Sequence, residues 1–372
     1  MVAMSGGVDS SVAAWLLRKA GCEVVGLHMH LWCEERQGKG AQSRHCCSVE
    51  DVHDAEDVCR LLGIPFYVLN LEQEFQACVV DYFCREYLRG RTPNPCLACN
   101  EHLKFRLLLQ RALALDAEYL ATGHYARIER SPDGCRLLKG VDAGKDQSYF
   151  LYMLGQAELA RLLFPVGERT KEEVRRIASE IGLPVAKKAD SVEVCFVADG
   201  DYRPFIAARF PRSPGDIVDR EGRVLGRHQG LAGYTIGQRQ GLGLSLGRRF
   251  YVVGMDVQNN RLVVGPEEEL YSRSLLACNV RWVGGRVPDM PLEVAARIRY
   301  RSPGAAAVVS QENGGVGVRF VEPQRAVTPG QAVVFYLGEE VLGGGIIERS
   351  DSDGERPAAH AGGRARASGA GV

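Results

Sequence analysis

A glycine turn at residues 5–11, with the sequence SGGVDSS, constrains the fold of this chain more than any other stretch. The apolar residues 1–4 before it are typical of the end of a β-strand, and apolar residues recur with helical spacing between Ser10 and Gly21. A strand that turns into a helix in this way points unpaired backbone N–H groups and the positive end of the helix dipole at one spot. The turn therefore predicts a binding site for a phosphate group.

Side chains of the turn favour a nucleotide as the ligand. The hydroxyl groups of Ser5, Ser10 and Ser11 offer further donors, and Asp9 would repel a bare phosphate unless Mg²⁺ lay between them. The turn has no lysine, so it is not a Walker A loop. It resembles the loop of the ATP pyrophosphatases (PP-loop enzymes), which transfer AMP from ATP to an oxygen of their substrate. The alternative is an ordinary strand-to-helix turn with a serine cap.

Strand-like and helical patterns alternate from the turn to about residue 200. Strands are expected at 23–32, 64–71 and 118–122, and helices at 49–62, 75–87 and 103–115. This order predicts an α/β domain with a mainly parallel sheet, in which ligands bind at the carboxyl ends of the strands. The glycine turn, Met29 and the pair Gly123-His124 would meet there. The strand before the turn is short, unless the natural chain begins upstream of Met1.

The pattern changes after this first part of the chain. Residues 125–144 predict a hairpin, 146–163 a helical stretch, and the capping box from Thr170 to Glu173 opens a further helix. Beyond residue 200 glycines multiply and short strands are expected, 234–236 among them, and from 275 to 347 every apolar run is strand-like. We therefore expect four parts: a catalytic domain at 1–200, a small central domain at 201–274, a β-domain at 275–349 and a disordered tail at 350–372.

Composition excludes several classes of protein. The 46 basic and 46 acidic residues balance, which argues against a protein that coats nucleic acid nonspecifically but leaves room for a local basic surface. No apolar run is long enough to span a membrane and no signal region opens the chain, so we expect a cytoplasmic protein. In that compartment the 12 cysteines indicate metal-binding, redox or nucleophilic roles rather than a disulfide framework.

Six sequence blocks further along the chain are specific enough to indicate a family. They are TPNPCLACN at 92–100, ATGHY at 121–125, KDQSYFL at 145–151, DSVEVCF at 190–196, GLAGYTIGQR at 230–239 and TPGQ at 328–331. In this order, from the first turn to about Glu348, the chain resembles the MnmA (TrmU) family of tRNA-specific 2-thiouridylases. The resemblance implies an N-terminal Rossmann-like PP-loop domain (adenine nucleotide alpha hydrolase), a small mixed or β central domain and a C-terminal β-barrel that contacts tRNA. It also implies ATP-dependent thiolation of the wobble uridine in the tRNAs for Lys, Glu and Gln.

The implied reaction needs sulfur chemistry as well as ATP. The oxygen at C2 of uracil leaves only after adenylation, and a second thiol must accept what remains of the sulfur donor. The resemblance assigns a persulfide to Cys195 and the resolving thiol to Cys99, which would end disulfide-bonded to each other. A cysteine desulfurase or a sulfur-relay protein would supply the sulfur. Judged from its neighbours alone, Cys195 between Val194 and Phe196 would be a core residue of a strand.

Cys96 departs from the family pattern, because many members have Asp at this position. Cys96 and Cys99 form a CxxC pair, and Cys195 would add a third thiolate, a set that suits a [4Fe-4S] cluster with one open iron. A CxxC pair also suits zinc or redox chemistry, and Cys46-Cys47 would be a further metal pair. A persulfide relay and a cluster-dependent route thus remain rival mechanisms with the same product.

The resemblance also implies contact residues for both substrates. The residues that match ATP contacts are Ala3, Met4, Ser5, Gly6, Gly7, Val8, Asp9, Ser10, Met29 and Gly123. The residues that match tRNA contacts are Asn94, Pro95 and Cys96, which meet the target base, and His124, Lys145, Asp146, Gln147, Arg299, Tyr300 and Gln331. The residues themselves add one expectation, since Arg297, Arg299 and Arg301 alternate in a predicted strand and would project from one face toward phosphates.

Two rival functions belong to other classes. One is a different PP-loop ligase, of the amidating or argininosuccinate type, which would need no reactive pair of thiols. The other is a non-catalytic RNA-binding scaffold gated by ATP, which the complete phosphate loop disfavours. Activity that survives loss of both cysteines would indicate the ligase, and tRNA binding without release of AMP would indicate the scaffold.

Overall fold

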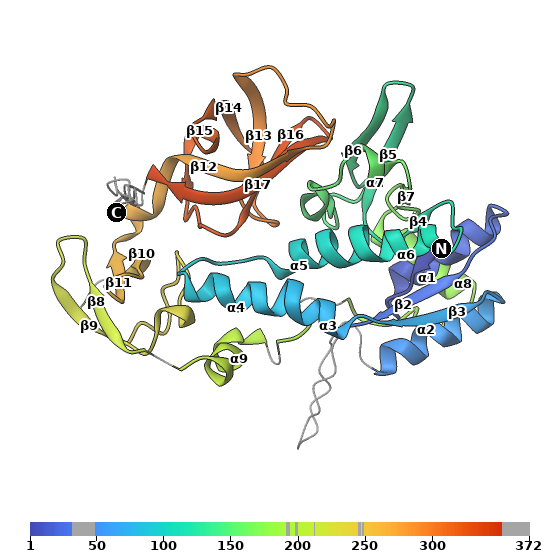
Figure 1. Cartoon of the computed structure of the whole chain (residues 1–372), viewed down its shortest axis with the longest axis horizontal. Helices are drawn as coiled ribbons and strands as arrows, with labels where there is room; N and C mark the ends of the chain where they lie inside the picture. Colours follow the sequence, from blue (N-terminus) through green and yellow to red (C-terminus); the bar gives the residue numbers. More distant parts are fainter. Residues whose placement is uncertain are drawn as a thin grey trace, which may run out of the picture.

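The computed structural model describes residues 1–31, 49–190, 194–197, 200–211, 213–244, 247 and 249–351. They form an α/β domain, a small β-domain and a β-barrel, which occupy the right, the lower left and the top of Figure 1. The expected metal pair Cys46-Cys47 and the tail from residue 352 onward lie outside the described residues, whereas Ser350 ends a barrel strand. Within the described ranges, no helix has the length and apolar character needed to cross a membrane.

The N-terminal sheet is parallel throughout, as the alternating pattern predicts. Its five strands run in the order β3-β2-β1-β4-β7. Their bounds are β1 (Val2–Ala3), β2 (Gly26–His30), β3 (Phe66–Asn70), β4 (Leu120–Ala121) and β7 (Leu162–Leu163). The two-residue strand β1 lies in the centre and pairs with both β2 and β4. The glycine turn therefore leaves the middle of the sheet, where the strand order reverses and ligands bind in folds of this kind.

Helices cover both faces of this sheet. One face carries α1 (Val8–Lys19), α2 (Val49–Leu62) and α8 (Lys171–Glu180), which share one apolar cluster with β1. The other carries α3 (Glu72–Phe75), the π-helical turn η1 (Gln76–Val80), α4 (Asp81–Leu88), α5 (Pro95–Ala98), the π-helical stretch η2 (Cys99–Leu108) and α6 (Leu109–Ala114). The predicted capping box at Thr170 is present, because its hydroxyl accepts from the Glu173 N–H and the Glu173 carboxylate accepts from the Thr170 N–H.

One helix prediction in this domain is wrong. Residues 146–163 form only the short helices η3 (Ser148–Leu151) and α7 (Gln156–Leu159), followed by strand β7. Tyr149 and residues 151–154 are all buried, so the first half of the stretch has no polar face of the kind that an amphipathic helix presents to water. The Tyr149 hydroxyl donates to the Ala332 carbonyl in the barrel, 3.0 Å away. Packing between domains, rather than helical periodicity, decides the conformation here.

The central domain is a four-stranded sheet in the order β10-β11-β8-β9. Its elements are α9 (Tyr202–Arg209), β8 (Gly215–Val218), β9 (Val224–His228), η5 (Leu231–Gly233), β10 (Tyr251–Asp256), β11 (Arg261–Gly265) and η6 (Glu267–Leu270). The strand expected at 234–236 is absent from the described residues, because these lie between η5 and a turn at Gly237, whose φ of 87° an extended strand does not accommodate.

The C-terminal barrel closes on itself and continues into the N-terminal domain. It contains β12 (Tyr271–Trp282), β13 (Leu292–Arg297), β14 (Ala305–Glu312), β15 (Gly315–Arg325), β16 (Ala332–Leu337) and β17 (Glu340–Ser350), and pairing of β12 with β17 closes it. The predicted hairpin is formed by β5 (Ala126–Ser131) and β6 (Gly134–Lys139), and β6 pairs with β17. The expected α/β architecture with a C-terminal β-barrel is thus confirmed, and one continuous ladder joins the two parts.

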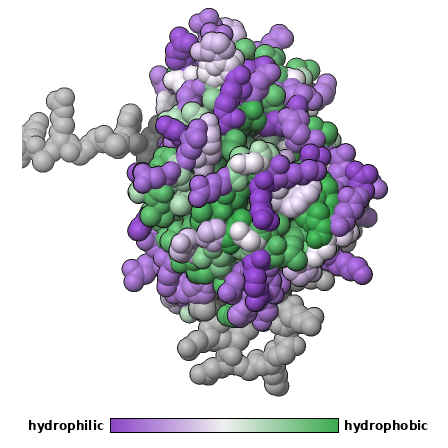
Figure 2. All heavy atoms as spheres, turned by 90° about the vertical axis from the view of Figure 1, so that its right-hand side faces the viewer, coloured by the Kyte–Doolittle hydropathy of each residue, from purple (hydrophilic) through white to green (hydrophobic). Residues whose placement is uncertain are grey.

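The surface at the N-terminal end of the molecule is mixed in character. In Figure 2, which views this end, hydrophobic and hydrophilic residues are intermixed over most of the surface that is coloured. The edge strand β3 contributes Tyr67 and Val68 to the exposed apolar residues of this domain. Single exposed apolar side chains are common on folded proteins, so they carry no functional argument here.

Candidate active site

The glycine turn has the predicted strand–turn–helix geometry. Gly7 is the N-cap of α1, and it brings no side chain to the first N–H groups of that helix. Gly6 has a φ of 69°, and a Cβ there would lie 2.3 Å from the carbonyl oxygen of Asp51 in α2. Only glycine fits this position, because both the backbone angle and the neighbouring helix exclude a side chain. The result is an uncapped helix N-terminus on a compact loop, suited to a phosphate.

The serine hydroxyls of the turn stabilise the loop itself. The Ser10 hydroxyl oxygen accepts from the Ser5 N–H at 3.2 Å, and the Ser11 hydroxyl donates to the Gly7 carbonyl at 2.8 Å. From outside the loop, the Lys188 ammonium donates to the Gly6 carbonyl at 2.9 Å. These contacts hold the backbone of the loop in place, so its N–H groups are pre-arranged for a ligand.

Asp9 is paired with a cation that the sequence did not reveal. Lys171, at the start of α8, donates to both carboxylate oxygens at 2.7 and 2.8 Å, and the Tyr125 hydroxyl donates to one of them at 2.8 Å. Burial, reinforced by the Asp9 charge, raises the pKa of Tyr125, so this hydroxyl remains a neutral donor. The carboxylate that would otherwise repel a phosphate is therefore compensated by a lysine 162 residues away along the chain.

The same lysine reaches the segment that carries Cys195. Its ammonium lies 2.8 Å from a carboxylate oxygen of Asp190, which also accepts from Lys145 and Arg175 at 2.8 Å each. Burial acts to raise the pKa of Asp190, but hydrogen bonds and charge from Lys145 and Lys171 outweigh it and lower the pKa to about 2. Lys145, one of the predicted tRNA contacts, is thus held by Asp190.

Gly123 closes the loop from the neighbouring strand. A Cβ at this position would lie 2.7 Å from the Ser10 nitrogen, so the end of β4 packs directly on the first turn of α1. Met4, at the other end of the loop, accepts at its carbonyl from His28 Nδ1 at 2.9 Å, and burial lowers the pKa of His28. Met29 follows on β2 and is buried. The predicted meeting of these segments at the carboxyl edge of the sheet is found.

The CxxC pair lies at the start of a long helix. The Asn94 side chain accepts from the Cys96 N–H at 3.1 Å and caps α5, with Pro95 at its first position. The helix was expected to begin only at residue 103, although an Asn-Pro cap signal was present in the sequence at 94–95. Cys96 is exposed, and Cys99, one turn further on, is buried.

Cys195 lies in a turn against the same apolar cluster that contains Cys99. Its neighbour Phe196 is buried, with ring centroids 5.2 Å from both Phe83 and Phe205. A cavity of about 280 Å³ has walls from both sides, contributed by Pro93 and Pro95 of the cap segment and by Val194 and Val197 of the Cys195 segment. The structure therefore brings together two segments about 100 residues apart, and Cys195 is half-buried in a turn rather than part of a strand core.

The three cysteines do not form a ligand set for a cluster. In the parts of the chain that the structure describes, no group of three or more His, Cys, Asp or Glu side chains could hold a metal ion. Cys96 is exposed, Cys99 is buried and Cys195 is half-buried, so the three cysteines lie in different surroundings. The residues present do not fit a [4Fe-4S] cluster in this conformation.

Among the predicted tRNA contacts of the N-terminal domain, Pro95, His124 and Asp146 are buried, Asn94, Lys145 and Gln147 are half-buried, and Cys96 is exposed. His124 bonds Thr122 at 2.6 Å, and burial, with the charge of Lys104, lowers its pKa well below the usual value. Asp146 accepts from the N–H groups of Gly140 and Ser148. The Gln147 side-chain oxygen accepts from the Tyr125 N–H at 3.0 Å. These side chains hold the loops beside the glycine turn in place.

The expectation of three arginines on one strand face is wrong. Strand β13 ends at Arg297, and residues 298–301 turn away, so the alternation does not continue. Arg297 donates to Asp146 at 3.0 Å, and Arg299 donates to the Ala326 carbonyl at 2.7 Å. The Tyr300 ring lies 4.5 Å from that of Phe150, measured between centroids. These residues therefore link the barrel to its own loops and to the N-terminal domain.

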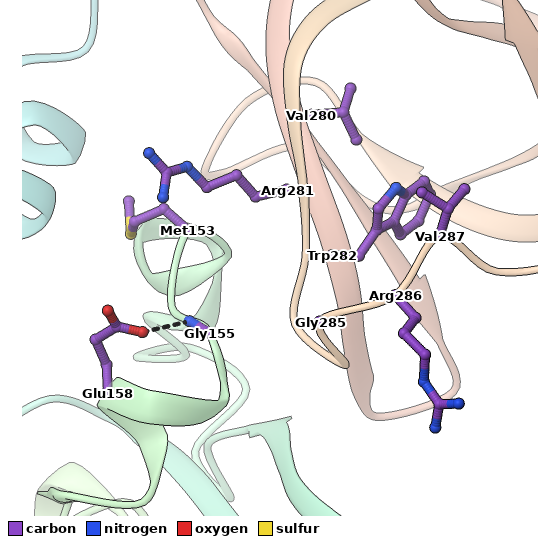
Figure 3. Close-up of a pocket in the computed structure, with 9 residues that line it drawn as sticks. All are labelled: Met153, Gly155, Glu158, Val280, Arg281, Trp282, Gly285, Arg286 and Val287. Atoms are coloured by element: carbon purple, nitrogen blue, oxygen red, sulfur yellow. Dashed lines mark hydrogen bonds between the residues drawn. The ribbon is translucent and has the colours of Figure 1, made fainter.

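A second cavity of about 320 Å³ lies between α7 and barrel strand β12 (Figure 3). In Figure 3, Arg281 extends from the barrel toward Met153, while the Glu158 carboxylate turns to the Gly155 N–H, 3.0 Å away. Arg281 is ion-paired with Glu101 at 2.8 Å. The cavity contains none of the predicted site residues and marks the junction of two domains.

Comparison with known proteins accounts for nearly the whole chain. Three family models match it: a tRNA methyl transferase HUP domain at 1–199, a tRNA methyl transferase PRC-barrel domain at 203–266 and an aminomethyltransferase beta-barrel domain at 272–347. A solved structure, NMN synthetase from Francisella tularensis, covers 51% of this chain and 65% of its own at 18% identity, with a TM-score of 0.31 that is too low to carry an argument.

Curated relatives are much more similar. The tRNA-specific 2-thiouridylase MnmA of Geobacter metallireducens is 51% identical over 360 residues, which cover 95% of this chain and 98% of the relative. The protein of that name from Geotalea uraniireducens is 50% identical over 356 residues, with coverages of 94% and 95%. Identity of this extent over all three domains shows that the chain belongs to the MnmA family of tRNA-specific 2-thiouridylases.

Proposed function

We propose that this chain makes 2-thiouridine at the wobble position of the tRNAs for Lys, Glu and Gln, in the cytoplasm, with ATP and a persulfide as co-substrates. Thiolation of tRNA follows from membership of the family, and the particular tRNAs and the sulfur route are our inference. The observation that carries the route is the shared cavity between Pro95 of the CxxC segment and Val194 beside Cys195. A base turned out of its stack at this cavity would lie beside the two segments that carry Cys99 and Cys195.

ATP activates the base in the first step. The uracil C2 oxygen attacks the α-phosphorus, a C2–O–P linkage forms, and pyrophosphate leaves with the electrons of the broken P–O bond. The uncapped N-terminus of α1 would receive the phosphates, and Gly6 and Gly123 leave room for them. Mg²⁺ would supply charge neutralisation for the phosphates, and Asp9 would hold it if the ion displaced the Lys171 ammonium from the carboxylate oxygens.

Sulfur replaces the activated oxygen in the second step. The terminal sulfur of a Cys195 persulfide attacks C2, a C2–S bond forms, and AMP leaves with the oxygen. The Cys99 thiolate then attacks the Cys195 sulfur, and the electrons of the broken S–S bond stay on the sulfur attached to C2, which becomes the thiocarbonyl. A Cys99–Cys195 disulfide remains. A dithiol reductant restores the thiols, and a cysteine desulfurase or relay protein reloads Cys195.

Contacts with tRNA would be local, because the net charge of the chain is zero. We assign Asn94, Pro95 and Cys96 to the target base, since they begin the helix beside the shared cavity. His124, Lys145, Asp146, Gln147, Arg299, Tyr300 and Gln331 are candidate contacts only if tRNA binding rearranges the bonds that now engage them. The two rival functions, a ligase and an RNA-binding scaffold, have no supporting observation of their own.

A thiolation assay on unmodified tRNA tests the proposal. C99A and C195A should each abolish 2-thiouridine, while the matched control C278A in the barrel should retain most of it, with or without an iron chelator. Brown protein with stoichiometric iron, and thiolation that depends on that iron and on Cys96, would overturn the relay. Activity that survives both C99A and C195A would instead indicate another PP-loop reaction.

A further inference from the structure

A turn of the barrel is hydrogen-bonded to the segment that leads into the CxxC helix. The turn is formed by residues 328–331, between β15 and β16. The Gln331 side-chain amide donates to the Thr92 carbonyl at 2.8 Å and to the Pro93 carbonyl at 3.4 Å. In return, the Thr92 N–H donates to the Pro329 carbonyl at 2.9 Å. Both backbone polar groups of Thr92 are thus bound by the barrel, although they lie more than 230 residues away along the chain.

The approach of the two segments is as close as the backbone permits. Gly330 has a φ of 92°, and a Cβ there would lie 3.0 Å from both the nitrogen and the oxygen of Thr92. The turn is in turn fixed to β17, because the Gly330 N–H donates to the Ile347 carbonyl and the Ile347 N–H donates to the Gln331 carbonyl. Because the turn is bonded to β17, the contact fixes the Thr92 backbone relative to the closed barrel rather than to a loose loop.

A half-buried arginine strengthens the same contact. Arg91 donates to the Glu348 carboxylate at 2.6 Å and to the Ile347 carbonyl at 3.2 Å, and its side chain is 18% exposed. It also lies 2.8 Å from Glu86 in α4. Residues 91–93 are consequently bound on their barrel side by three independent sets of hydrogen bonds.

The segment that the barrel binds leads directly into the CxxC helix. Thr92 and Pro93 come directly before Asn94, whose side chain caps α5, and Pro93 and Pro95 form one wall of the cavity shared with the Cys195 segment. A displacement of residues 92–93 would move the cap and hence the turn that presents Cys96 and Cys99. The barrel turn is therefore placed to set the position of the resolving thiol.

We propose that Gln331 is a positioning residue for sulfur transfer, which acts by holding the Thr92-Pro93 backbone so that Cys99 faces the Cys195 segment. The inference rests on the proposed function and differs from the role as a tRNA contact that family resemblance implies for Gln331. A tRNA contact would contribute to tRNA affinity, whereas a positioning residue contributes to the rate of the bound complex.

The test is the variant Q331M, which keeps the length of the side chain and removes its donors. Loss of the Gln331 hydrogen bonds to the Thr92 and Pro93 carbonyls should lower kcat for thiolation about tenfold, while the Kd for tRNA stays within about twofold. It should also speed the alkylation of Cys99 by iodoacetamide at least threefold. The weaker attachment of residues 92–93 would let the start of the helix open more often and expose this buried thiol. If Q331M does not fold, Q331A removes the same donors without adding a new group.

The matched control is Q324M, in strand β15 of the same barrel. Gln324 is also half-buried, and its amide donates to the Glu322 carbonyl at 2.9 Å, away from the CxxC segment. Q324M should leave kcat, tRNA affinity and Cys99 alkylation unchanged. A rise in the Kd for tRNA of about tenfold with kcat unchanged would overturn the inference, as would an unaltered alkylation rate. Since alkylation requires no turnover, it reports on the attachment of residues 92–93 to the barrel even if the proposed sulfur route proves wrong.

Discussion

At the scale of single residues, the glycine turn carries one charge that bears on its proposed role, the carboxylate of Asp9. A carboxylate in a phosphate loop is unfavourable unless a cation compensates it, and Lys171 does so with a side chain that is only 10% exposed. The same ammonium bonds Asp190, so one lysine joins the loop that would hold ATP to the segment that carries Cys195. Its removal leaves two carboxylates short of a partner.

The variant K171M tests this role. We expect the free energy of unfolding to fall by about 2 kcal/mol, at the lower end for a broken buried pair because Asp9 and Asp190 are partly exposed, and ATP affinity to fall with it. Urea denaturation and nucleotide titration measure the two effects. The exposed neighbour Lys187 provides a control, since K187M should lie within about 0.5 kcal/mol of the parent. Equal stabilities for the two variants would contradict the proposed role of Lys171.

Asp190 should also make the free energy of unfolding depend on pH in the acidic range. Its pKa in the folded protein, about 2, lies below the usual value of 3.8 for an aspartate, so the unfolded chain takes up this proton first as the pH falls. The stabilisation is fully present above about pH 4 and is lost progressively toward pH 2. Urea denaturation of the parent and of D190N between pH 5 and pH 3 should show a steeper decline for the parent. Parallel curves would show that Asp190 has no such shift.

At the scale of secondary structure, the start of the CxxC helix determines which thiol is exposed. Asn94 caps α5 and Pro95 occupies the first position, where its missing N–H costs nothing. The helix then continues through the π-helical stretch η2 into α6. Because the turn begins at Pro95, Cys96 lies on the solvent side and Cys99 on the buried side.

Removal of the cap should loosen this first turn. We expect N94A to lower the free energy of unfolding by about 1 kcal/mol, the usual value for a lost N-cap, and to speed amide hydrogen exchange in residues 95–99. N94D keeps an acceptor for the Cys96 N–H and should behave like the parent. Exchange in N94A that is confined to other parts of the chain would refute the assignment of Asn94 as the cap that matters here.

At the scale of the whole molecule, the barrel is built into the N-terminal domain rather than tethered to it. Strand β17 pairs with β6, and Arg297 at the end of β13 donates to Asp146, whose side chain is 2% exposed. Asp146 in turn accepts from the backbone N–H groups of Gly140 and Ser148. The arginine therefore connects a barrel strand to the loop at residues 140–148 of the N-terminal domain.

Loss of that arginine should be costly. R297M would leave the buried Asp146 carboxylate without its cation, and we expect the free energy of unfolding to drop by about 3 kcal/mol. Arg319, exposed on β15, is the matched position, and R319M should change stability by less than about 0.5 kcal/mol. Chemical denaturation of both variants decides the point, and a loss of similar size in each would argue against a special role for the interdomain pair.

The sequence by itself determined the features that depend on neighbours along the chain. The glycine turn at 5–11, the capping box at Thr170 and the alternation of strands and helices were predicted because turn, cap and periodicity preferences act within a few residues. The order of the motif blocks was enough to indicate the family. Where local periodicity alone was used, as for residues 146–163 and for the three arginines near 299, packing between domains overruled it.

Only the tertiary structure decided which distant groups meet. Lys171 against Asp9, the Gln331 amide on the Thr92 carbonyl, and the Cys195 segment beside Pro95 join residues about 100 or more positions apart. Such pairs leave no periodic signal, because their positions are set by the packing of whole sheets and barrels rather than by the preferences of neighbouring residues. The parts of the site were therefore readable from the sequence, whereas their mutual placement was a property of the folded chain.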